Sequence, residues 1–410
     1  MVGNVIVGQS GGPTAVINSS LAGVYKTAKD LGAGKVYGMR YGIQGFLEKN
    51  IVDMDEKIRS DLDLELLKRT PSAFLGSCRY KLPDICDDRE LYDRIFEILK
   101  EYEITAFFYI GGNDSMDTIK KLSDYAILIN SDIRFMGVPK TIDNDLAVTD
   151  HTPGYGSAAK FIASVTKEVI RDGLVYDVKN VTVIEIMGRN AGWLTGAAAL
   201  AKCEDCEGVD LLYLPELPFD VESFLQKVGR LLEQKKTVVV AVSEGIKTAD
   251  GKYVFELTSH TEYVDAFGHK QLSGTARYLS TLISEKFGCK SRAIELATMQ
   301  RCAGHLTSRV DITEAYQVGG SAVKAAFDGD TGKVVILKRV SEDPYICTTD
   351  LYDVHKIANI EKKVPLEWIT NDGTYVSQKL VNYIKPLIQA ELTPIMITGQ
   401  PRHLVIDMEA

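Results

Sequence analysis

The feature that most constrains this chain is a series of strand-like apolar runs, each followed by glycine or polar residues and then by a helical pattern. Short continuous apolar runs indicate strands that are buried on both faces, as in parallel sheets. Apolar residues recur at helical spacing from about residue 14 to residue 31, and again from about residue 115. The runs cover residues 5–7, 35–39, 104–110, 135–138, 181–186 and 238–242. This alternation predicts a doubly wound α/β fold with mainly parallel sheets.

Length and charge limit the classes of partner. The 410 residues are 45% hydrophobic and 25% charged, a composition that favours two or three globular domains or lobes. The formal net charge is -9 and no long basic run is present, so nucleic acid and anionic membrane surfaces are excluded as main partners. No apolar run approaches the roughly 18 residues of a membrane span. The chain opens on a strand pattern, so we expect no signal peptide and a cytoplasmic protein.

The seven cysteines are spread along the chain. Cys203 and Cys206 form a C-x-x-C pair, but a zinc site would require a second pair with suitable spacing, and the sequence has none. A thioredoxin-like context is also missing. We therefore interpret the cysteines as reduced thiols. The glycine-rich stretch 151–157 is the best candidate for a domain boundary.

Two loops concentrate the chemistry of the chain. Residues 109–115 read Tyr-Ile-Gly-Gly-Asn-Asp-Ser, and residues 138–145 read Val-Pro-Lys-Thr-Ile-Asp-Asn-Asp. Each loop follows an apolar run, at the position where a parallel strand meets its carboxyl-terminal loop. Open α/β sheets bind their ligands at those loops. The pair of loops therefore predicts phosphate, metal and an acid/base group in one crevice.

The turn at residues 8–13, Gly-Gln-Ser-Gly-Gly-Pro, lies between a predicted strand and a predicted helix. Its glycines, Gly11 and Gly12 among them, let the main chain approach an anion at a helix N-terminus. It matches neither a Walker A loop nor G-x-G-x-x-G. A tight strand-to-helix turn explains the same residues equally well.

The loop around Gly111 is also a glycine-rich turn between a predicted strand and a predicted helix. Asn113 and Asp114 can orient a hydrated Mg²⁺ ion or its phosphate ligands, and we expect Ser115 to cap the following helix. The alternative is a plain capped turn.

The loop from Lys140 to Asp145 is harder to explain as structure alone. Asp143 and Asp145 are two carboxylates two residues apart beside a lysine, which costs stability unless they are paired or used. One can act as general base on a hydroxyl while the other holds metal. The lysine can neutralise phosphate charge. The alternative is a solvated polar turn.

Two further strand ends carry charged residues. Arg189 follows the run 181–186, and Glu244 follows the run 238–242. We favour ligand contacts over plain surface positions for both. Spacing alone assigns no role to the remaining candidate arginines, which are Arg79, Arg292 and Arg301.

Taken together, these motifs resemble those of the phosphofructokinases, in the same order and spacing, from about residue 3 to beyond residue 310. The matching motifs are Gly11-Gly12-Pro13, Gly76-Ser77-Cys78-Arg79, Gly111–Ser115, Pro139–Asp145, Met187-Gly188-Arg189 and Gln300-Arg301. The resemblance implies two Rossmann-like, three-layer α/β/α lobes with mainly parallel sheets. It also implies Mg²⁺-assisted phosphoryl transfer to O1 of fructose 6-phosphate, giving fructose 1,6-bisphosphate.

The resemblance assigns roles at the transferred phosphoryl group. Asp143 corresponds to the base that takes the proton of the 1-hydroxyl, and Asp145 would assist it and the metal. Thr141 would contact the sugar or the transferred group. Arg79 would stabilise charge on that group in the transition state. Donor binding would involve Gly11, Gly12, Arg79, Asn113, Asp114, Ser115 and Lys140.

The resemblance also implies a sugar site lined by Met187, Gly188, Arg189 and Glu244. Arg292 and Arg301 would hold the 6-phosphate. In this family the residue that corresponds to Arg292 usually reaches over from a neighbouring subunit, which implies a homodimer or homotetramer with a shared site.

The implied lobes follow from these assignments. Residues 1–155 would form the donor-binding lobe, completed by part of 300–375. Residues 156–300 would bind fructose 6-phosphate, completed by the C-terminal segment to 410.

Two residues bear on the phosphoryl donor. ATP-using members resemble Gly-Gly-Asp-Gly-Ser and Pro-Gly-Thr-Ile-Asp-Asn-Asp, whereas this chain has Asp114 at the second glycine position and Lys140 before Thr141. A carboxylate at 114 would repel the α-phosphate of a nucleotide, and a lysine at 140 suits a shorter, denser anion. Both changes are similar to those of the pyrophosphate-dependent branch, the diphosphate–fructose-6-phosphate 1-phosphotransferases.

Other positions depart from the family pattern. Asn113 stands where an aspartate usually binds Mg²⁺, so the metal would be held mainly by pyrophosphate with Asp143 or Asp145. Asn180 stands where short ATP-dependent members place a second intersubunit arginine, and Lys179 is a candidate to replace it. Cys302-Ala303 makes the loop after Arg301 poorer in glycine, and the region past about 320 receives no assignment.

Three alternatives remain open. The first is an enzyme that uses ATP, or both ATP and pyrophosphate, and substitutions at residues 114 and 140 would distinguish it. A catalytically silent regulatory subunit would have lost the base or the phosphate arginines, yet Asp143, Arg79 and Arg189 are present. A nucleotide or lipid kinase that shares only the Gly-Gly-x-x-Ser loop would leave the loop 140–145 unexplained.

Overall fold

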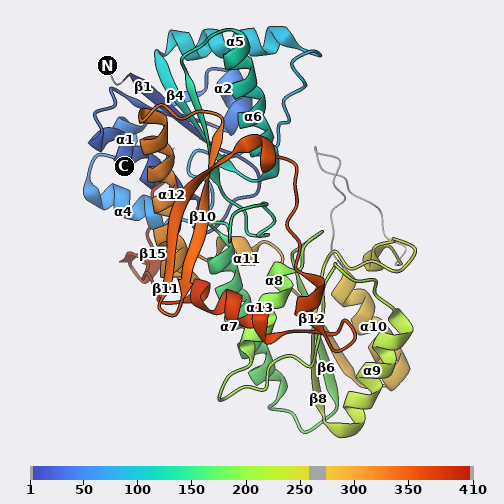
Figure 1. The fold of residues 1–410 in the computed structure, drawn as a ribbon. Helices are drawn as coiled ribbons and strands as arrows, with labels where there is room; N and C mark the ends of the chain where they lie inside the picture. The colour runs from blue at the N-terminus through green and yellow to red at the C-terminus, as the bar shows by residue number, and fades with distance from the viewer. Residues whose placement is uncertain (1–2, 258–273, 407–410) are drawn as a thin grey trace. The chain divides into compact units, whose positions relative to one another are not determined.

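The computed structural model describes residues 3–257 and 274–406. The chain forms two compact units, and each is built from segments that are distant in the sequence (Figure 1). Unit 1 comprises Met1–Ser157, Arg301–Glu361 and Gln389–Ala410, and unit 2 comprises Ala158–Gln300 and Lys362–Ile388. Among the described residues, no helix is both long and apolar enough to cross a membrane.

Unit 1 is built on a seven-stranded sheet with the order β11-β10-β5-β4-β1-β2-β3. The strands from β2 through β10 pair in parallel, and the edge strands β3 and β11 are antiparallel. Its strands are β1 (Asn4–Gln9), β2 (Val36–Met39), β3 (Ile51–Asp53), β4 (Ile104–Gly111), β5 (Arg134–Pro139), β10 (Lys333–Glu342) and β11 (Tyr345–Asp353).

Helices cover both faces of this sheet because successive side chains of each strand point to opposite faces. Val5 and Val7 pack into one apolar cluster with α1, α4 and α12, while Ile6 packs into another with α2, α5 and α6. The helices are α1 (Ile17–Asp30), α2 (Gly42–Leu47), α3 (Met54–Lys57), α4 (Asp61–Arg69), α5 (Arg89–Glu101), α6 (Asn113–Leu128) and α12 (Arg309–Phe327). The result is a three-layer α/β/α unit. Short elements, η3 (Gly304–Leu306), η4 (Val354–Lys356), β14 (Met396–Ile397) and β15 (Gln400–Pro401), complete it.

Unit 2 contains a four-stranded parallel sheet with the order β7-β8-β6-β9. Its strands are β6 (Asn180–Ile186), β7 (Leu211–Tyr213), β8 (Thr237–Ser243) and β9 (Lys290–Glu295). Helix α9 begins where the Asp220 carboxylate accepts a hydrogen bond from the Ser223 main-chain N–H, and α9 and α10 pack their apolar residues against β6 and β8. The helices of unit 2 are α8 (Trp193–Gly196), α9 (Val221–Gln234), α10 (Thr275–Phe287) and α13 (Gln378–Ile384), and α7 (Tyr155–Gly173) and α11 (Met299–Cys302) each begin in one unit and end in the other. Two short strands, β12 (Ile369–Thr370) and β13 (Tyr375–Val376), and the 3₁₀ turns η1 (Ala197–Ala201), η2 (Val254–Leu257), η5 (Leu366–Trp368) and η6 (Lys385–Ile388) complete unit 2.

The predicted α/β class with mainly parallel sheets is confirmed, and each strand-like run becomes a strand within one or two residues of its expected ends. The predicted cap at Ser115 is wrong. Helix α6 begins at Asn113 after Gly112, with no side-chain cap. Ser115 is instead buried beneath Gly111, where its Oγ would lie 1.8 Å from a Cβ at that position. The serine fills the space that the glycine leaves.

Candidate active site

The register of the unit 1 sheet brings three loops to one edge. Gly8 lies opposite Tyr109, and Gly111 lies opposite Pro139, so β1, β4 and β5 end side by side. The main-chain N–H of Lys140 donates a hydrogen bond of 3.0 Å to the carbonyl oxygen of Gly111. Strand order therefore gathers the glycine loop after β1, the loop after β4 and the lysine loop after β5.

The Lys140 side chain joins the first and third of these loops. Its Nζ donates a hydrogen bond of 2.7 Å to the Gly12 carbonyl oxygen and lies 3.4 Å from the position a Cβ would take at Gly11. Gly11 has a φ of 74°, a backbone conformation that a glycine adopts without strain. Arg301 Nη1 lies 3.0 Å from the position of a Cβ at Gly12. Two cationic groups thus border the glycine loop.

Burial and the neighbouring charges together set the pKa of Lys140. Its side chain is only 3% exposed, and burial lowers the pKa of its ammonium to about 8. The carboxylates of Asp143 and Asp145 counteract this shift. Arg301 and Arg79 lower the pKa of Lys140 further, because like charges disfavour each other. The cations therefore form a local positive cluster in a chain of net charge -9, and that cluster favours an anionic ligand.

Arg79 is exposed at the end of a loop that is tied to the same glycines. The Gly11 main-chain N–H donates a hydrogen bond of 3.1 Å to the Cys78 carbonyl oxygen. The Ser77 hydroxyl donates one of 2.6 Å to the Gly11 carbonyl oxygen. These bonds fix the segment before Arg79 beside the glycine loop. Ser77 was not among the predicted site residues.

The turn that contains Asp143 is held by main-chain and side-chain hydrogen bonds. The Asp143 N–H donates a hydrogen bond of 3.1 Å to Thr141 Oγ1. Thr152 Oγ1 donates one of 2.8 Å to the Thr141 carbonyl oxygen, and the Thr152 N–H donates one of 3.1 Å to Asn144 Oδ1. Asn144 is fully buried with a φ of 54°. The carboxylates of Asp143 and Asp145 therefore project from a tightly fixed turn.

The first turn of α6 supplies oxygen atoms at the same sheet edge. Asp114 lies in this turn, where the helix dipole stabilises a negative charge. The buried Oδ1 of Asn113 has no hydrogen-bond partner among the described residues. Divalent cations such as Mg²⁺ prefer amide and carboxylate oxygens, so Asn113 with Asp143 and Asp145 forms a donor set that suits such an ion.

Unit 2 holds a second group of predicted site residues at the carboxyl ends of β6 and β8. The Gly188 N–H donates a hydrogen bond of 3.4 Å to Glu244 Oε1, and the Ser243 hydroxyl donates one of 2.6 Å to the Gly188 carbonyl oxygen. Gly188 has a φ of 134°, which a glycine adopts readily. Arg189 follows, and a Cβ at Gly245 would lie 2.0 Å from its carbonyl oxygen. The two loops therefore pack directly on each other.

Gln300 orders the neighbouring residue Met187. Its Oε1 accepts a hydrogen bond of 3.2 Å from the Met187 N–H, and its Nε2 donates one of 3.0 Å to the Ala297 carbonyl oxygen. Sequence reasoning noticed Gln300 only as part of a motif and gave it no role. Its position directly before Arg301, a candidate site arginine, was the signal that the sequence offered.

Arg292 lies apart from this group within its own chain. It stands opposite Thr182 in the middle of β6, four residues before Ile186, which corresponds to about 13 Å along the strand. It forms an ion pair of 3.2 Å with Asp172 and lies 5.8 Å from the centre of the Tyr176 ring. Arg292, Asp172 and Thr182 border a cavity of about 330 Å³ beside the edge strand β9.

Asn180 and Lys179 differ sharply in exposure. Asn180 is buried, and its Nδ2 donates hydrogen bonds to Val178 O at 3.1 Å and Thr237 Oγ1 at 3.0 Å. Lys179 is exposed. Asn180 therefore serves the packing of unit 2, and only Lys179 presents a charge at this position.

A cationic cluster over a glycine loop, with two carboxylates on the adjoining turn, has the groups that phosphoryl transfer requires. The family model for phosphofructokinase matches residues 4–326. The chain belongs to the phosphofructokinase family.

Relatives agree with this membership over nearly the whole chain. The chain is 38% identical to the pyrophosphate–fructose 6-phosphate 1-phosphotransferase of Halomonas elongata, covering 97% of this chain and 95% of the relative. It is 40% identical to the protein of the same name from Xanthomonas campestris pv. campestris, and the match covers 95% of this chain and 92% of the relative. The crystal structure of the pyrophosphate-dependent phosphofructokinase of Nitrosospira multiformis superposes with a TM-score of 0.88 at 35% identity, covering 98% and 95% of the two chains. The predicted resemblance to this family and to its pyrophosphate-dependent branch is confirmed.

Proposed function

We propose that the chain is a cytoplasmic, pyrophosphate-dependent 6-phosphofructokinase of glycolysis and gluconeogenesis. It transfers a phosphoryl group reversibly from pyrophosphate to O1 of fructose 6-phosphate, giving fructose 1,6-bisphosphate and phosphate. The observation that carries this proposal is the buried ammonium of Lys140, which lies on the Gly12 carbonyl oxygen beside the turn of Asp143 and Asp145. The names of relatives at 38–40% identity support it.

Pyrophosphate is the donor that the electrostatics of unit 1 favour. A compact, highly charged anion can replace the contact of Lys140 with a neutral carbonyl oxygen by a hydrogen bond in which both partners are charged. Asp114 adds a negative charge at the start of α6, where a bound nucleotide would have to extend. Gly11 and Gly12 leave room for the phosphates, because a Cβ at either position would lie 3.0–3.4 Å from the cationic groups of Arg301 and Lys140, and Ser115 contacts the donor from beneath Gly111.

The transfer itself needs a base and stabilisation of charge. Asp143 takes the proton of the sugar 1-hydroxyl while the oxygen of that hydroxyl attacks the terminal phosphorus of pyrophosphate and phosphate leaves. Asp145 assists Asp143. Thr141 fixes the Asp143 main chain and faces the reacting groups. Arg79 and Lys140 compensate the negative charge of the transferred phosphoryl group.

Fructose 6-phosphate binds to the loops of unit 2. The Glu244 carboxylate accepts hydrogen bonds from sugar hydroxyls, while Met187, Gly188 and Arg189 line the sugar. Arg301 and the Arg292 of a neighbouring subunit hold the 6-phosphate. Arg292 fits this role because it lies far along β9 from the sugar-binding loops of its own chain.

A divalent ion fits the oxygen donors of unit 1, and we assign it as Mg²⁺ held by Asn113, Asp143 and Asp145 together with pyrophosphate. The buried, unpartnered Oδ1 of Asn113 supports this assignment. When bound, the ion neutralises part of the charge of pyrophosphate.

A homodimer or homotetramer follows from the shared site. Close to Arg292, the segment after α7 exposes four apolar side chains to solvent in the single chain, each at least 50% exposed. Such a patch suits an interface between subunits. Its members are Leu174, Val175, Tyr176 and Val178.

The decisive experiment measures fructose 1,6-bisphosphate formation from fructose 6-phosphate with either pyrophosphate or ATP and Mg²⁺. We expect activity with pyrophosphate and at least a hundredfold lower kcat/KM with ATP, a difference of about 2.7 kcal/mol. The reverse reaction, with phosphate and fructose 1,6-bisphosphate, should also proceed. Activity with ATP alone would replace the donor assignment, and inactivity with both donors would favour the regulatory-subunit alternative.

A further inference from the structure

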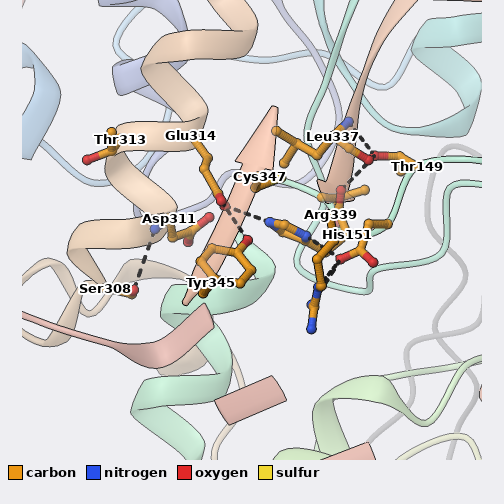
Figure 2. A network of polar contacts seen from close by, with 12 residues as sticks. Thr149, His151, Ser308, Asp311, Thr313, Glu314, Leu337, Arg339, Tyr345 and Cys347 are labelled. Carbon is orange, nitrogen blue, oxygen red and sulfur yellow. Dashed lines mark hydrogen bonds and ion pairs between the residues drawn. The ribbon is translucent and has the colours of Figure 1, made fainter. Parts of the chain in front are cut away.

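A buried histidine of unit 1 lies between two carboxylates (Figure 2). His151 Nδ1 is 2.8 Å from Asp150 Oδ1, and His151 Nε2 is 2.6 Å from Glu314 Oε2. The His151 side chain is 1% exposed and that of Glu314 is 6% exposed. Because both ring nitrogens face carboxylate oxygens, each nitrogen can donate a hydrogen bond when the ring is doubly protonated.

The surrounding groups favour this doubly protonated form. Arg339 Nη2 lies 3.0 Å from Asp150 Oδ1, and the Tyr345 hydroxyl donates a hydrogen bond of 2.7 Å to Glu314 Oε1. Two carboxylates then face two cations, so the buried charges balance. Burial opposes the imidazolium, but the two carboxylates outweigh it and raise the pKa of His151 to about 9.

The remaining neighbours stay neutral near pH 7. Burial, reinforced by the Glu314 charge, raises the pKa of the Cys347 thiol to about 12. The same two causes raise the pKa of the Tyr345 hydroxyl. His151 and Arg339 are therefore the cations that compensate the carboxylates of this network.

The histidine belongs to a segment that supports the turn of Asp143. The next residue, Thr152, donates hydrogen bonds to Asn144 Oδ1 at 3.1 Å and to the Thr141 carbonyl oxygen at 2.8 Å. The Pro153 carbonyl oxygen accepts one of 3.2 Å from the Thr141 N–H. The path from the imidazole to the catalytic turn thus runs through one residue.

The same segment is fixed to strand β10 and helix α12. The Asp150 N–H donates a hydrogen bond of 2.9 Å to the Leu337 carbonyl oxygen. Further along, the Asp311 carboxylate accepts hydrogen bonds of 2.8 Å from the N–H groups of Gly154 and Ser157. Helix α12 therefore holds the segment at two points, through Glu314 to His151 and through Asp311 to the two main-chain N–H groups.

We propose that His151 is a positioning residue for phosphoryl transfer. As a cation between Asp150 and Glu314, it fixes residues 149–154 and, through Thr152, the turn that carries Asp143. This inference rests on the proposed function for its catalytic consequence, but the contacts that carry it lie outside the reacting groups. Loss of the imidazolium releases the turn and displaces Asp143 from the 1-hydroxyl, while Lys140, whose N–H is bonded to the Gly111 carbonyl oxygen, and the loops of unit 2 keep their places.

A metal site is the competing interpretation of the same residues. One ligand atom from each of His151, Glu314 and Cys347 lies within 4.8 Å of the others. Two ligands of a tetrahedral zinc, each at about 2.0–2.1 Å, stand about 3.3 Å apart. The 2.6 Å between His151 Nε2 and Glu314 Oε2 is shorter and corresponds to a direct hydrogen bond. The geometry favours the ion pair.

The test compares His151→Gln and Glu314→Gln with a matched control, His355→Gln. His355 also lies between two carboxylates, Asp353 at 2.8 Å and Asp124 at 2.9 Å, but on the surface. We expect kcat of the two network variants to fall about 10- to 100-fold, since misplacing a catalytic group by about 1 Å costs up to that much. The KM values for pyrophosphate and fructose 6-phosphate should stay within about twofold, and the control should match the wild type.

The pH profile adds a readout that a general loss of stability would not give. In Glu314→Gln the imidazolium loses one of its two carboxylates, so the alkaline limb of kcat should move to lower pH. The pH dependence of the KM for pyrophosphate, which follows the ammonium of Lys140, should stay as in the wild type. An unshifted kcat limb in Glu314→Gln overturns the proposal.

Amide hydrogen exchange tests the positioning without substrate. Exchange in a peptide covering residues 141–154 should rise in both network variants and stay at the wild-type level in His355→Gln. If wild-type protein lacks phosphofructokinase activity but this exchange pattern appears, the proposed function fails and the positioning of the turn stands. Unchanged kcat and exchange in both network variants, or one equivalent of zinc in purified wild-type protein that His151→Gln loses, would overturn the inference.

Discussion

The side-chain ammonium of Lys140 donates a hydrogen bond of 2.7 Å to the main-chain carbonyl oxygen of Gly12. The bond joins the loop after β5 to the loop after β1, and the strand between them, β4, contributes the third loop. The ammonium of Lys140 therefore lies against a glycine loop 128 residues away in the sequence. We expect this side chain, together with Asp114, to set the donor preference, and its ammonium to set the pH dependence of pyrophosphate use.

Pyrophosphate use should decline above about pH 8. The pKa of Lys140 is lowered to about 8, so in the free enzyme the ammonium is present below this pH and lost above it. We expect kcat/KM for pyrophosphate to fall up to tenfold per pH unit beyond that point. Lys140→Arg keeps the charge, so its profile should lack this limb. Pyrophosphate itself also titrates, but it does so equally in both experiments, so a difference between the two pH profiles reports Lys140 alone. Identical profiles would contradict the role of the Lys140 ammonium in pyrophosphate binding.

Replacing the two donor-specific residues should shift the donor preference. In the double variant Asp114→Gly with Lys140→Gly, kcat/KM for pyrophosphate should drop about 10- to 100-fold, because a hydrogen bond to a charged group contributes about 1.5–3 kcal/mol. Use of ATP should rise, since the carboxylate that repels a nucleotide is gone. Steady-state kinetics of the double variant and both single variants would check this, and an unchanged ratio of the two donors would refute the role of these residues.

Removing the proposed base should abolish turnover while sparing binding. Asp143→Asn keeps the size of the side chain and its place in the turn, but it cannot accept the proton, so kcat should fall about 10²- to 10⁴-fold. The KM for pyrophosphate should change little. Asp132→Asn, at an exposed carboxylate before β5, provides a control that should remain fully active. Retained turnover in Asp143→Asn would exclude this residue as the base.

The sequence predicted that the loops at residues 109–115 and 138–145 lie in one crevice, but it did not predict that the Lys140 side chain would contact the glycine loop at residues 8–13. Continuous apolar runs mark buried strands, and the residues that follow such strands are ligand candidates. Strand order decides which loops become neighbours, and a run such as 5–7 does not reveal that β4 will lie beside it. The contact of Lys140 with Gly12 depends on that order. Resemblance to a family, rather than periodicity, assigned the residue roles.

Local patterns failed where tertiary packing decided the outcome. Ser115 follows two glycines and an Asn-Asp pair, which is typical of a capped helix start, yet it fills the space under Gly111. His151 attracted notice only as part of a glycine-rich stretch. Its partner Glu314 follows 163 residues later, so no local pattern could reveal the pair.

Arg292 should act on the substrate of a neighbouring subunit, and mixed oligomers can show this. Arg292→Ala alone should raise the KM for fructose 6-phosphate at least tenfold, because a charge-assisted contact to the 6-phosphate is lost. The control is Arg277→Ala, which removes another arginine of unit 2, one that forms an ion pair with Glu295. Its KM for fructose 6-phosphate should stay near the wild-type value.

Co-expression of Arg292→Ala with Asp143→Asn should then restore activity that neither variant has by itself at low substrate concentration. In a dimer that contains one copy of each, one site combines both defects, while the other combines an intact Asp143 with an intact Arg292 from its partner. Random pairing makes about half of the dimers mixed, so about a quarter of all sites should be intact. A chain carrying both substitutions gives no such rescue and serves as the control. If mixed oligomers form, as tagged-subunit purification would show, yet stay inactive, then Arg292 acts within its own chain or not at all.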